Sequence, residues 1–226
     1  MRPKDRKVVP GIPPNHACLL RLGGFHGKPR RHPWPHLPPL ICLTDAARFP
    51  DPLPIAAQLP RESLVVFRHY QTAGRRALAH RLASFCRSRG LRFLVAGDAA
   101  LAIETHADGL HLPEWLARGP VSRGWGWRRR KPGWLLTAAA HCETSLARAA
   151  RAGADAVLLA PVFPTASHPG ADGLGILRFA TLAHRTDVPV YGLGGINIGT
   201  VRRLRGAGAA GIAVVSALAK KNGHPP

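Results

Sequence analysis

The sequence predicts an α/β protein: a single-domain (β/α)8 TIM barrel over residues 39–221, preceded by a basic, proline-rich N-terminal arm. Three observations lead to this prediction. Short apolar runs alternate with longer amphipathic segments rich in Ala and Arg, the runs are apolar at nearly every position, and eight of them follow residue 39. Strands that are apolar on both faces are typical of parallel sheets covered by helices. Strand–helix alternation predicts right-handed crossovers.

The eight apolar runs are the expected strands. In chain order they are Leu40–Thr44, Leu64–Phe67, Phe93–Ala96, Gly109–Leu112, Trp134–Ala138, Ala156–Ala160, Val188–Leu193 and Gly211–Val215. Eight strand–helix units in about 180 residues make a compact barrel. A doubly wound open sheet is the structural alternative, and the count of eight favours closure.

Helical patterns separate these strands. The clearest are Gly74–Arg89, Cys142–Ala152, Ile176–Arg185 and Ile198–Gly206. In the second, apolar residues recur at helical spacing. The patterns of the third and fourth helices are weaker, so they support the count of eight units less than the others do.

Residues 1–38 differ in composition from the rest of the chain. They are rich in Pro, Gly, Arg and His, and proline removes backbone donors and fixes φ. We therefore expect a disordered basic arm, or sequence upstream of the true start. A similar composition at residues 118–132, which include four consecutive basic residues, predicts a long exposed loop.

The composition favours anionic partners. The 226 residues include 32 Lys and Arg against 12 Asp and Glu, a formal charge of +20. These partners could be phosphorylated metabolites, nucleic acid or acidic lipid surfaces. Because the basic residues are spread over the whole chain, a general use of Arg on helix surfaces explains the charge better than nucleic-acid binding does. No apolar run reaches membrane-spanning length, so no membrane partner is expected. Four cysteines without zinc spacing suit a reducing cytoplasm, and Cys42 and Cys86 are predicted to be buried thiols.

A phosphate site is predicted from the last two strands. Gly194 and Gly195 follow the seventh expected strand, and Val215 and Ser216 end or follow the eighth. Glycines let backbone approach a ligand, and these two loops are the common phosphate site of barrels. The plainer interpretation is that the glycines serve only a tight turn and that Ser216 only caps a helix.

His141 is the candidate catalytic residue. It directly follows the fifth apolar run and precedes a helix, so it is expected near the barrel mouth, where an imidazole can move protons. A lone histidine is more often structural. The loop after the sixth strand, residues 160–169, is polar and stiffened by proline, and by composition alone it is an ordinary surface loop.

Several short motifs then form a recognisable order. They are His141, the runs 152–155 (Ala-Gly-Ala-Asp), 161–165 (Pro-Val-Phe-Pro-Thr), 194–196 (Gly-Gly-Ile) and 214–217 (Val-Val-Ser-Ala), with 40–45 and 107–112 upstream. Over residues 40–219 the chain resembles the thiamine phosphate synthase/TenI family. The resemblance implies that the phosphate of a thiazole phosphate is held by Thr165, Ser167, Gly195, Val215 and Ser216. It also implies a pocket near Thr44.

The chain departs from the synthase pattern where pyrophosphate and Mg²⁺ would bind. Of the family's Gln-x-Arg-x-Lys only Arg68 is retained, and His168 replaces the basic residue of the flexible loop. Asp98 falls one residue from a metal-site position, and residues 113–116 (Pro-Glu-Trp-Leu) have no Asp at the other. We therefore expect no metal and no cofactor, with Mg²⁺ only if the protein is a true synthase.

Three functions remain open. The first is a TenI-like thiazole tautomerase with His141 as general acid and base. The second is a thiamine phosphate synthase with a divergent cation site built from Arg68, Asp98, Glu114 and His168. The third is a non-catalytic phosphate-ligand binder, or a barrel associated with nucleic acid through its charge. A homo-oligomer is left open in each case.

Overall fold

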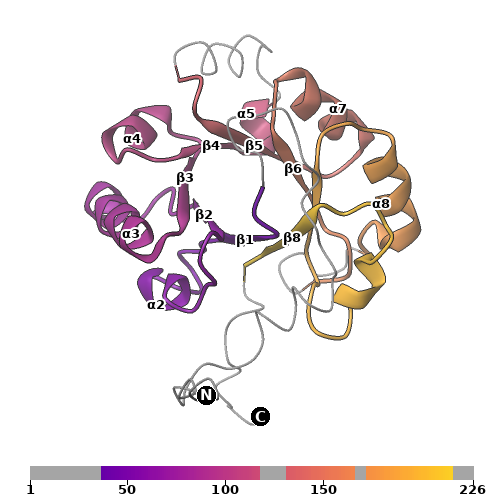
Figure 1. The fold of residues 1–226 in the computed structure, drawn as a ribbon, viewed down its shortest axis with the longest axis horizontal. Coiled ribbons are helices and arrows are strands. Elements are labelled where there is room, and N and C mark those ends of the chain that lie inside the picture. Colours follow the sequence, from indigo (N-terminus) through magenta and orange to yellow (C-terminus); the bar gives the residue numbers. More distant parts are fainter. Residues whose placement is uncertain (1–36, 118–130, 166–171, 216–226) are drawn as a thin grey trace, which may run out of the picture.

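The computed structural model describes residues 37–117, 131–165 and 172–215 (Figure 1). In these ranges eight parallel strands close into one barrel in chain order, and the helices lie outside it. The predicted (β/α)8 barrel is therefore confirmed. The predicted arm lies outside the described residues apart from Leu37 and Pro38, and it stays a prediction.

Each strand coincides with an expected apolar run. The strands are β1 Leu40–Leu43, β2 Leu64–Phe67, β3 Arg92–Ala96, β4 Gly109–Leu112, β5 Leu135–Ala140, β6 Ala156–Leu159, β7 Val190–Leu193 and β8 Gly211–Val214. Strand β5 continues past Ala138 because Ala139 and Ala140 pair with β6. The barrel closes where Leu40 of β1 pairs with Ile212 of β8.

The crossovers carry helices of very different length. They are α2 Leu53–Ala56, α3 Arg75–Arg89, α4 Ala99–Glu104, α5 Glu114–Ala117, α7 Glu143–Arg151, α8 Gly175–His184 and the 3-10 helix η1 Val201–Leu204. The helices after β3 and β4, where the helical pattern is weak, do form: α4 has 6 residues and α5 has 4.

The helix expected over residues 198–206 is wrong in extent, since only the single turn η1 forms. The side chain of Asn197 accepts hydrogen bonds from the backbone N–H groups of Gly199 and Thr200, as the N-cap of a helix does, so its bonding favours a helix at the start of the pattern. At the other end, Gly206 and Gly208 adopt left-handed conformations with φ of 75° and 78°. The helix is therefore cut short at its carboxyl end.

The strands bury two separate layers of apolar side chains. Residues such as Leu43, Val66 and Leu158 fill the barrel interior, whereas their neighbours pack outward against the helices. Because side chains alternate along a strand, the inward face of β1, β2 and β5 continues to Asp45, Arg68 and His141 just beyond the strand ends. The alternation thus carries these three side chains to the mouth of the barrel.

The predicted buried thiols are confirmed. Cys42 and Cys86 are fully buried in the outer layer, and burial raises the pKa of both thiols to about 12. The described part of the chain contains no helix that is both long and apolar enough to cross a membrane.

Candidate active site

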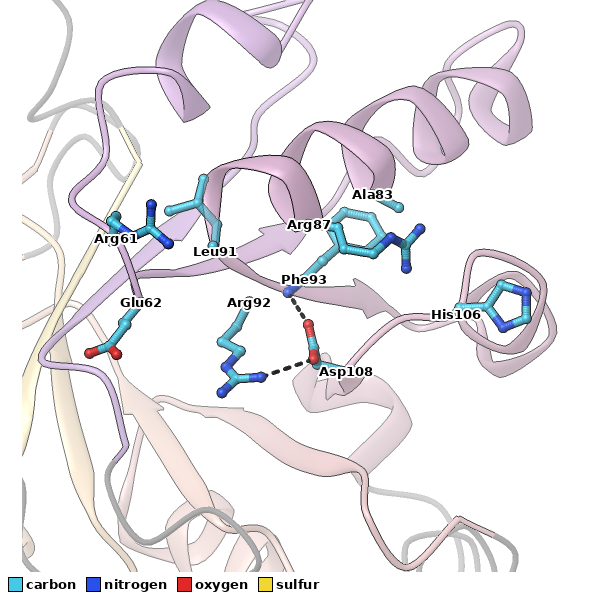
Figure 2. A pocket seen from close by; sticks show the side chains of 10 residues that line it. Arg61, Glu62, Ala83, Arg87, Leu91, Arg92, Phe93, His106 and Asp108 are labelled. Atoms are coloured by element: carbon cyan, nitrogen blue, oxygen red, sulfur yellow. Dashed lines mark hydrogen bonds and ion pairs between the residues drawn. The ribbon is translucent and has the colours of Figure 1, made fainter.

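Two hollows lie at opposite ends of the barrel. The smaller, of about 370 Å³, lies beside the amino ends of β3 and β4 and is lined largely by charged side chains (Figure 2). The larger, of about 580 Å³, opens at the carboxyl ends of the strands and is lined by residues of β1, β2 and β4–β8 or the loops after them. Ligands of parallel barrels bind at the carboxyl ends, so the larger hollow, here called the mouth pocket, is the candidate active site.

The mouth pocket gathers most of the residues predicted from the sequence. Those that line it are His141, Arg68, Thr165, Gly194, Gly195 and Val215. Thr44 does not line it, although its neighbours Leu43 and Asp45 do. Ser167, His168 and Ser216 lie outside the described residues.

His141 is held in a defined orientation at the end of β5. Its ring Nδ1 lies 2.8 Å from the carbonyl oxygen of Ala160, which can only accept, so Nδ1 carries a hydrogen and donates it. Its backbone N–H donates to the hydroxyl of Ser145, 2.8 Å away, and this hydroxyl donates in turn to the carbonyl of Cys142. Ser145 is itself buried, and it fixes the turn between β5 and α7.

The other ring nitrogen of His141 faces a carboxylate. Nε2 lies 3.5 Å from Oε2 of Glu114, the first residue of α5. With Nδ1 occupied by the carbonyl, a neutral ring presents the Nε2 lone pair, and a protonated ring has the Glu114 carboxylate beside it. The arrangement can accept a proton at Nε2 and stabilise the resulting imidazolium.

The glycine turn after β7 brings backbone close to the pocket. Gly194 and Gly195 have φ of 93° and 65°, and a Cβ on Gly195 would lie 2.6 Å from the carbonyl oxygen of Pro164. No side chain larger than hydrogen fits there. Within the described ranges, no group accepts a hydrogen bond from the N–H of Gly195 or Ile196. Two unpaired N–H groups in a turn can bind an anion.

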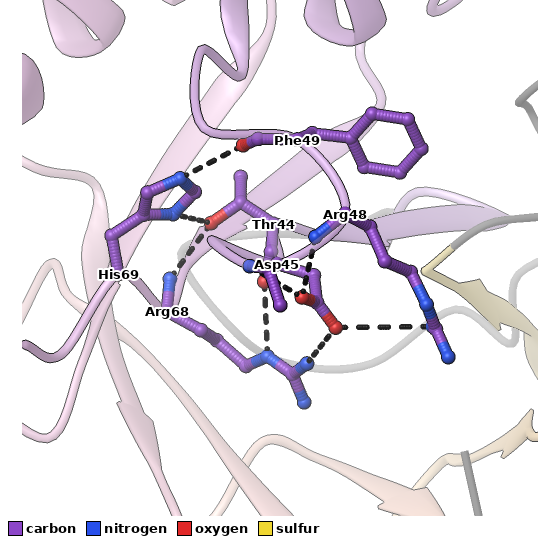
Figure 3. Close-up of polar contacts among 7 residues, drawn as sticks. Thr44, Asp45, Arg48, Phe49, Arg68 and His69 are labelled. Atoms are coloured by element: carbon purple, nitrogen blue, oxygen red, sulfur yellow. Dashed lines mark hydrogen bonds and ion pairs between the residues drawn. The ribbon is translucent and has the colours of Figure 1, made fainter. Parts of the chain in front are cut away.

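Thr44 lies beneath the pocket in a buried hydrogen-bond network (Figure 3). Its hydroxyl lies 2.9 Å from Nδ1 of His69 and accepts from the backbone N–H of Arg68, also at 2.9 Å. Nε2 of His69 lies 3.1 Å from the carbonyl oxygen of Phe49, to which it donates. The Thr44 hydroxyl is thus used in hydrogen bonds to His69 and Arg68. It connects the segments after β1 and β2, and Thr44 does not line the pocket.

The same network aims Arg68 at the pocket (Figure 3). Its Nε donates to the carbonyl oxygen of Thr44 at 3.1 Å, and its Nη2 lies 3.8 Å from Oδ2 of Asp45. Asp45 also lies 3.8 Å from Nη1 of Arg48. Two guanidinium groups against one carboxylate give this side of the pocket a positive charge.

His111 forms an uncharged polar part of the pocket wall. It lies on β4, is 2% exposed, and its Nδ1 is 2.8 Å from the hydroxyl of Thr137 on β5. Burial, with a smaller effect of the Arg68 charge, lowers its pKa to about 3. At neutral pH His111 is therefore a neutral imidazole next to a basic group.

The carboxylates near the mouth do not form a metal site. Asp98 caps α4 by accepting from the N–H of Leu101, and its other oxygen pairs with Arg75. Although burial raises the pKa of Asp98, these hydrogen bonds and the Arg75 charge lower it overall. Asp45 pairs with arginines and Glu114 with His141. No three acidic, His or Cys residues in the described ranges cluster in a way that could hold a metal ion.

Most of the barrel matches a known protein family. Residues 55–218 match the family described as thiamine monophosphate synthase. The chain belongs to the thiamine monophosphate synthase family. The family resemblance noted in the sequence is thereby confirmed, and the matched part includes the mouth-pocket residues from Arg68 to Val215.

Over the aligned residues, three relatives are about one third identical to this chain. The thiamine-phosphate synthase of Chlorobium luteolum is 32% identical over 190 residues, covering 82% of this chain and 87% of the relative. That of Aromatoleum aromaticum is 33% identical over 175 residues, covering 74% and 82%. A match at 37% identity to an Aquifex aeolicus protein spans 53% of this chain and 60% of that protein's length.

Solved structures agree on the fold. The thiamine phosphate pyrophosphorylase from Pyrococcus furiosus superposes with a TM-score of 0.63 at 22% identity, covering 79% of this chain and 85% of that one. At this identity the likeness supports the TIM barrel of the thiamine monophosphate synthase family and nothing finer.

Four polar residues that line the pocket were not predicted as site residues: Asp45, Arg48, His111 and Asn197. Glu114 was predicted only as part of a possible cation site, and the structure brings it to His141 instead. Alternation along the strands could have found Asp45 and His111, which share the inward parity of Leu43 and Gly109. No sequence signal indicates the Glu114–His141 contact, because it depends on how α5 lies against the loop after β5.

Proposed function

We propose that the protein is a TenI-like member of the thiamine monophosphate synthase family that moves a proton on a thiazole phosphate. The observation that carries the proposal is the environment of His141: Nδ1 is held by the Ala160 carbonyl, and Nε2 faces Glu114 at the edge of the mouth pocket. Nε2 would take one proton from the thiazole tautomer and return one at another position, so the ligand gains aromaticity and His141 is regenerated.

The phosphate of the ligand would bind at the opposite wall. The N–H groups of Gly195 and Ile196 have no acceptor in the described structure, and the left-handed turn lets a phosphate approach them closely. Thr165 lines the same pocket. This assignment agrees with the phosphate loops that the family resemblance implies, of which Ser167 and Ser216 remain a sequence-based expectation.

Coupling of a pyrimidine diphosphate is less favoured by the residues present. That reaction needs cations for the departing pyrophosphate. The carboxylates near the mouth already pair with Arg75, Arg68 and His141, and a carboxylate bound to an arginine is a poor ligand for a second cation. We therefore derive no step through Mg²⁺.

A thiamine phosphate synthase remains the second candidate because one observation favours it. Arg68 and Arg48 both line the mouth pocket on its positive side, and they could bind a diphosphate without a metal. The matched relatives also carry the synthase name.

An assay of both reactions separates the two candidates. The purified protein is given the thiazole phosphate tautomer alone, or the aromatic thiazole phosphate with the pyrimidine diphosphate, each with and without Mg²⁺. We expect tautomerisation that is unchanged by Mg²⁺ or by EDTA. Mg²⁺-dependent formation of thiamine phosphate at ordinary enzyme rates would favour the second candidate.

A further inference from the structure

The smaller hollow, at the other end of the barrel from the mouth pocket, is a second candidate site (Figure 2). Its side chains come from four segments: Arg61 before β2, Arg87 in α3, Arg92 at the start of β3, and His106 after α4. We refer to it as the amino-end pocket. Nothing in the proposed chemistry uses it.

Two of its arginines have no partner in the described structure. The guanidinium groups of Arg61 and Arg87 form no ion pair or hydrogen bond there. Arg89, on the same helix but outside the pocket, instead donates to the carbonyl oxygen of Ala57. The guanidinium groups of Arg61 and Arg87 are thus available to a ligand.

The nearby backbone acceptors are already occupied. At the end of α3, the N–H groups of Gly90 and Leu91 bind the carbonyls of Arg87 and Cys86. The carbonyl of Gly90 accepts from the N–H of Glu62 at 2.8 Å. Arg61 lies over Gly90, where a Cβ would be 3.1 Å from its Nη2. The Arg61 guanidinium therefore lies against the end of α3, where the nearby backbone carbonyls already accept other hydrogen bonds.

The third arginine is oriented by an acidic neighbour. Asp108 accepts a hydrogen bond from the N–H of Phe93 at 2.8 Å and lies 3.5 Å from Nη1 of Arg92 (Figure 2). The charges of Arg92 and Asp108 cancel each other, and Glu62 is the other carboxylate that lines the pocket. With three arginines against two carboxylates, the lining keeps a net positive charge before His106 is counted.

Two lining residues also adopt a rare backbone conformation. Glu62 and His106 have φ of 67° and 52°, in the left-handed region that non-glycine residues seldom occupy. His106 adopts this conformation where α4 ends, with the N–H of Ala107 bonded to the carbonyl of Ala102. Both residues line the amino-end pocket.

We propose that the amino-end pocket binds a small phosphate-bearing anion, of the inorganic pyrophosphate or phosphate-ester class. Planar guanidinium groups bind phosphate oxygens in pairs, which fits the unpaired Arg61 and Arg87. A volume of about 370 Å³ suits a small ligand. The site is separate from the mouth pocket and independent of the reaction proposed there.

The test uses pyrophosphate as the probe and hydrogen–deuterium exchange of the full chain as the readout. We expect pyrophosphate to slow exchange at residues 87–92 and 106–108. The double variant Arg61→Gln/Arg87→Gln should weaken this effect about 10-fold or more, since each lost charged hydrogen bond contributes substantially. Exposed arginines tolerate this change, so the fold should persist.

The matched control is Arg81→Gln/Arg89→Gln, which removes the same charge from α3 outside the pocket. This control should bind pyrophosphate at the amino-end pocket as the wild type does. Protection confined to residues 194–197 and 214–215 would place the anion in the mouth pocket alone and overturn the proposal. Equal weakening in both double variants would overturn it too, by showing attraction to net charge rather than a site.

Discussion

Nε2 of His141 lies 3.5 Å from a carboxylate oxygen of Glu114, while Nδ1 of the same ring lies 2.8 Å from the carbonyl oxygen of Ala160. The contact with Ala160 orients the ring through Nδ1, and Nε2 is left to exchange a proton beside Glu114. Glu114 follows β4 and His141 follows β5, so adjacent strands bring the pair together at the barrel mouth. Proton transfer needs a general acid and base within reach of the substrate, and this pair lies at the edge of the mouth pocket.

Glu114→Gln should slow proton transfer while leaving phosphate affinity unchanged. The amide keeps the size of the side chain but removes the charge that stabilises protonated His141. We expect kcat to fall about 10-fold, in line with the strength of a charge-assisted hydrogen bond, with KM nearly constant. Steady-state kinetics of tautomerisation measures both. A tenfold rise in KM at constant kcat would mean that Glu114 binds substrate instead.

Gly195→Val should abolish binding of the thiazole phosphate. The new side chain would meet the carbonyl of Pro164 and Cβ of Phe163 within 3 Å, in a backbone conformation that valine avoids. Isothermal titration calorimetry measures the affinity. Gly133→Ala is the control, because a Cβ there has nothing within 4 Å. Unchanged affinity in a folded Gly195→Val protein would place the phosphate on other strands.

Thr44→Val should destabilise the barrel rather than block ligand binding. The change leaves Nδ1 of buried His69 and the N–H of Arg68 without their partner, at a cost of about 1–3 kcal/mol. Thermal unfolding should show a Tm lower by several degrees. Thr181→Val removes an exposed hydroxyl bound to the carbonyl of Leu177 and serves as the control. Equal Tm values for the two variants would contradict the structural role of Thr44.

His111 should make the protein less stable in acid. Its folded pKa of about 3 lies below the ordinary 6.5, so the unfolded chain binds an extra proton between these values. The stability from neutral His111 is present above pH 6.5 and is lost as pH falls toward 3, with a slope of at most about 1.4 kcal/mol per unit. Denaturant unfolding across this range should show a shallower loss for His111→Gln. His184→Gln, at an exposed histidine, should keep the wild-type slope.

The fold was predictable because it depends on local patterns. Each strand is buried on both faces, so runs such as Val65–Phe67 and Leu158–Leu159 are apolar throughout and mark the strands directly. The exception is the helical pattern from Ile198, which forms only a single turn because the left-handed Gly206 and Gly208 follow it. A pattern of apolar residues does not report where glycines end a helix.

The site was predictable only in part. Strand order places His141, Gly195 and Arg68 at one end of the barrel, so their gathering follows from the fold itself. The resemblance implied a pocket near Thr44, and its neighbours Leu43 and Asp45 line the mouth pocket. The Thr44 hydroxyl itself bonds to His69 and Arg68, which the sequence did not indicate. Hydrogen bonds between residues about 25 positions apart are set by packing, which the sequence does not reveal.

The central claim is that Nε2 of His141 moves the proton, and His141→Ala tests it most directly. We expect the variant to lose tautomerisation of the thiazole phosphate by about 10²–10⁴-fold while binding the phosphate ligand with nearly wild-type affinity. The two quantities are measured on one preparation, by the rate of aromatisation and by calorimetric titration. Full tautomerase activity in the His141→Ala protein would contradict the claim.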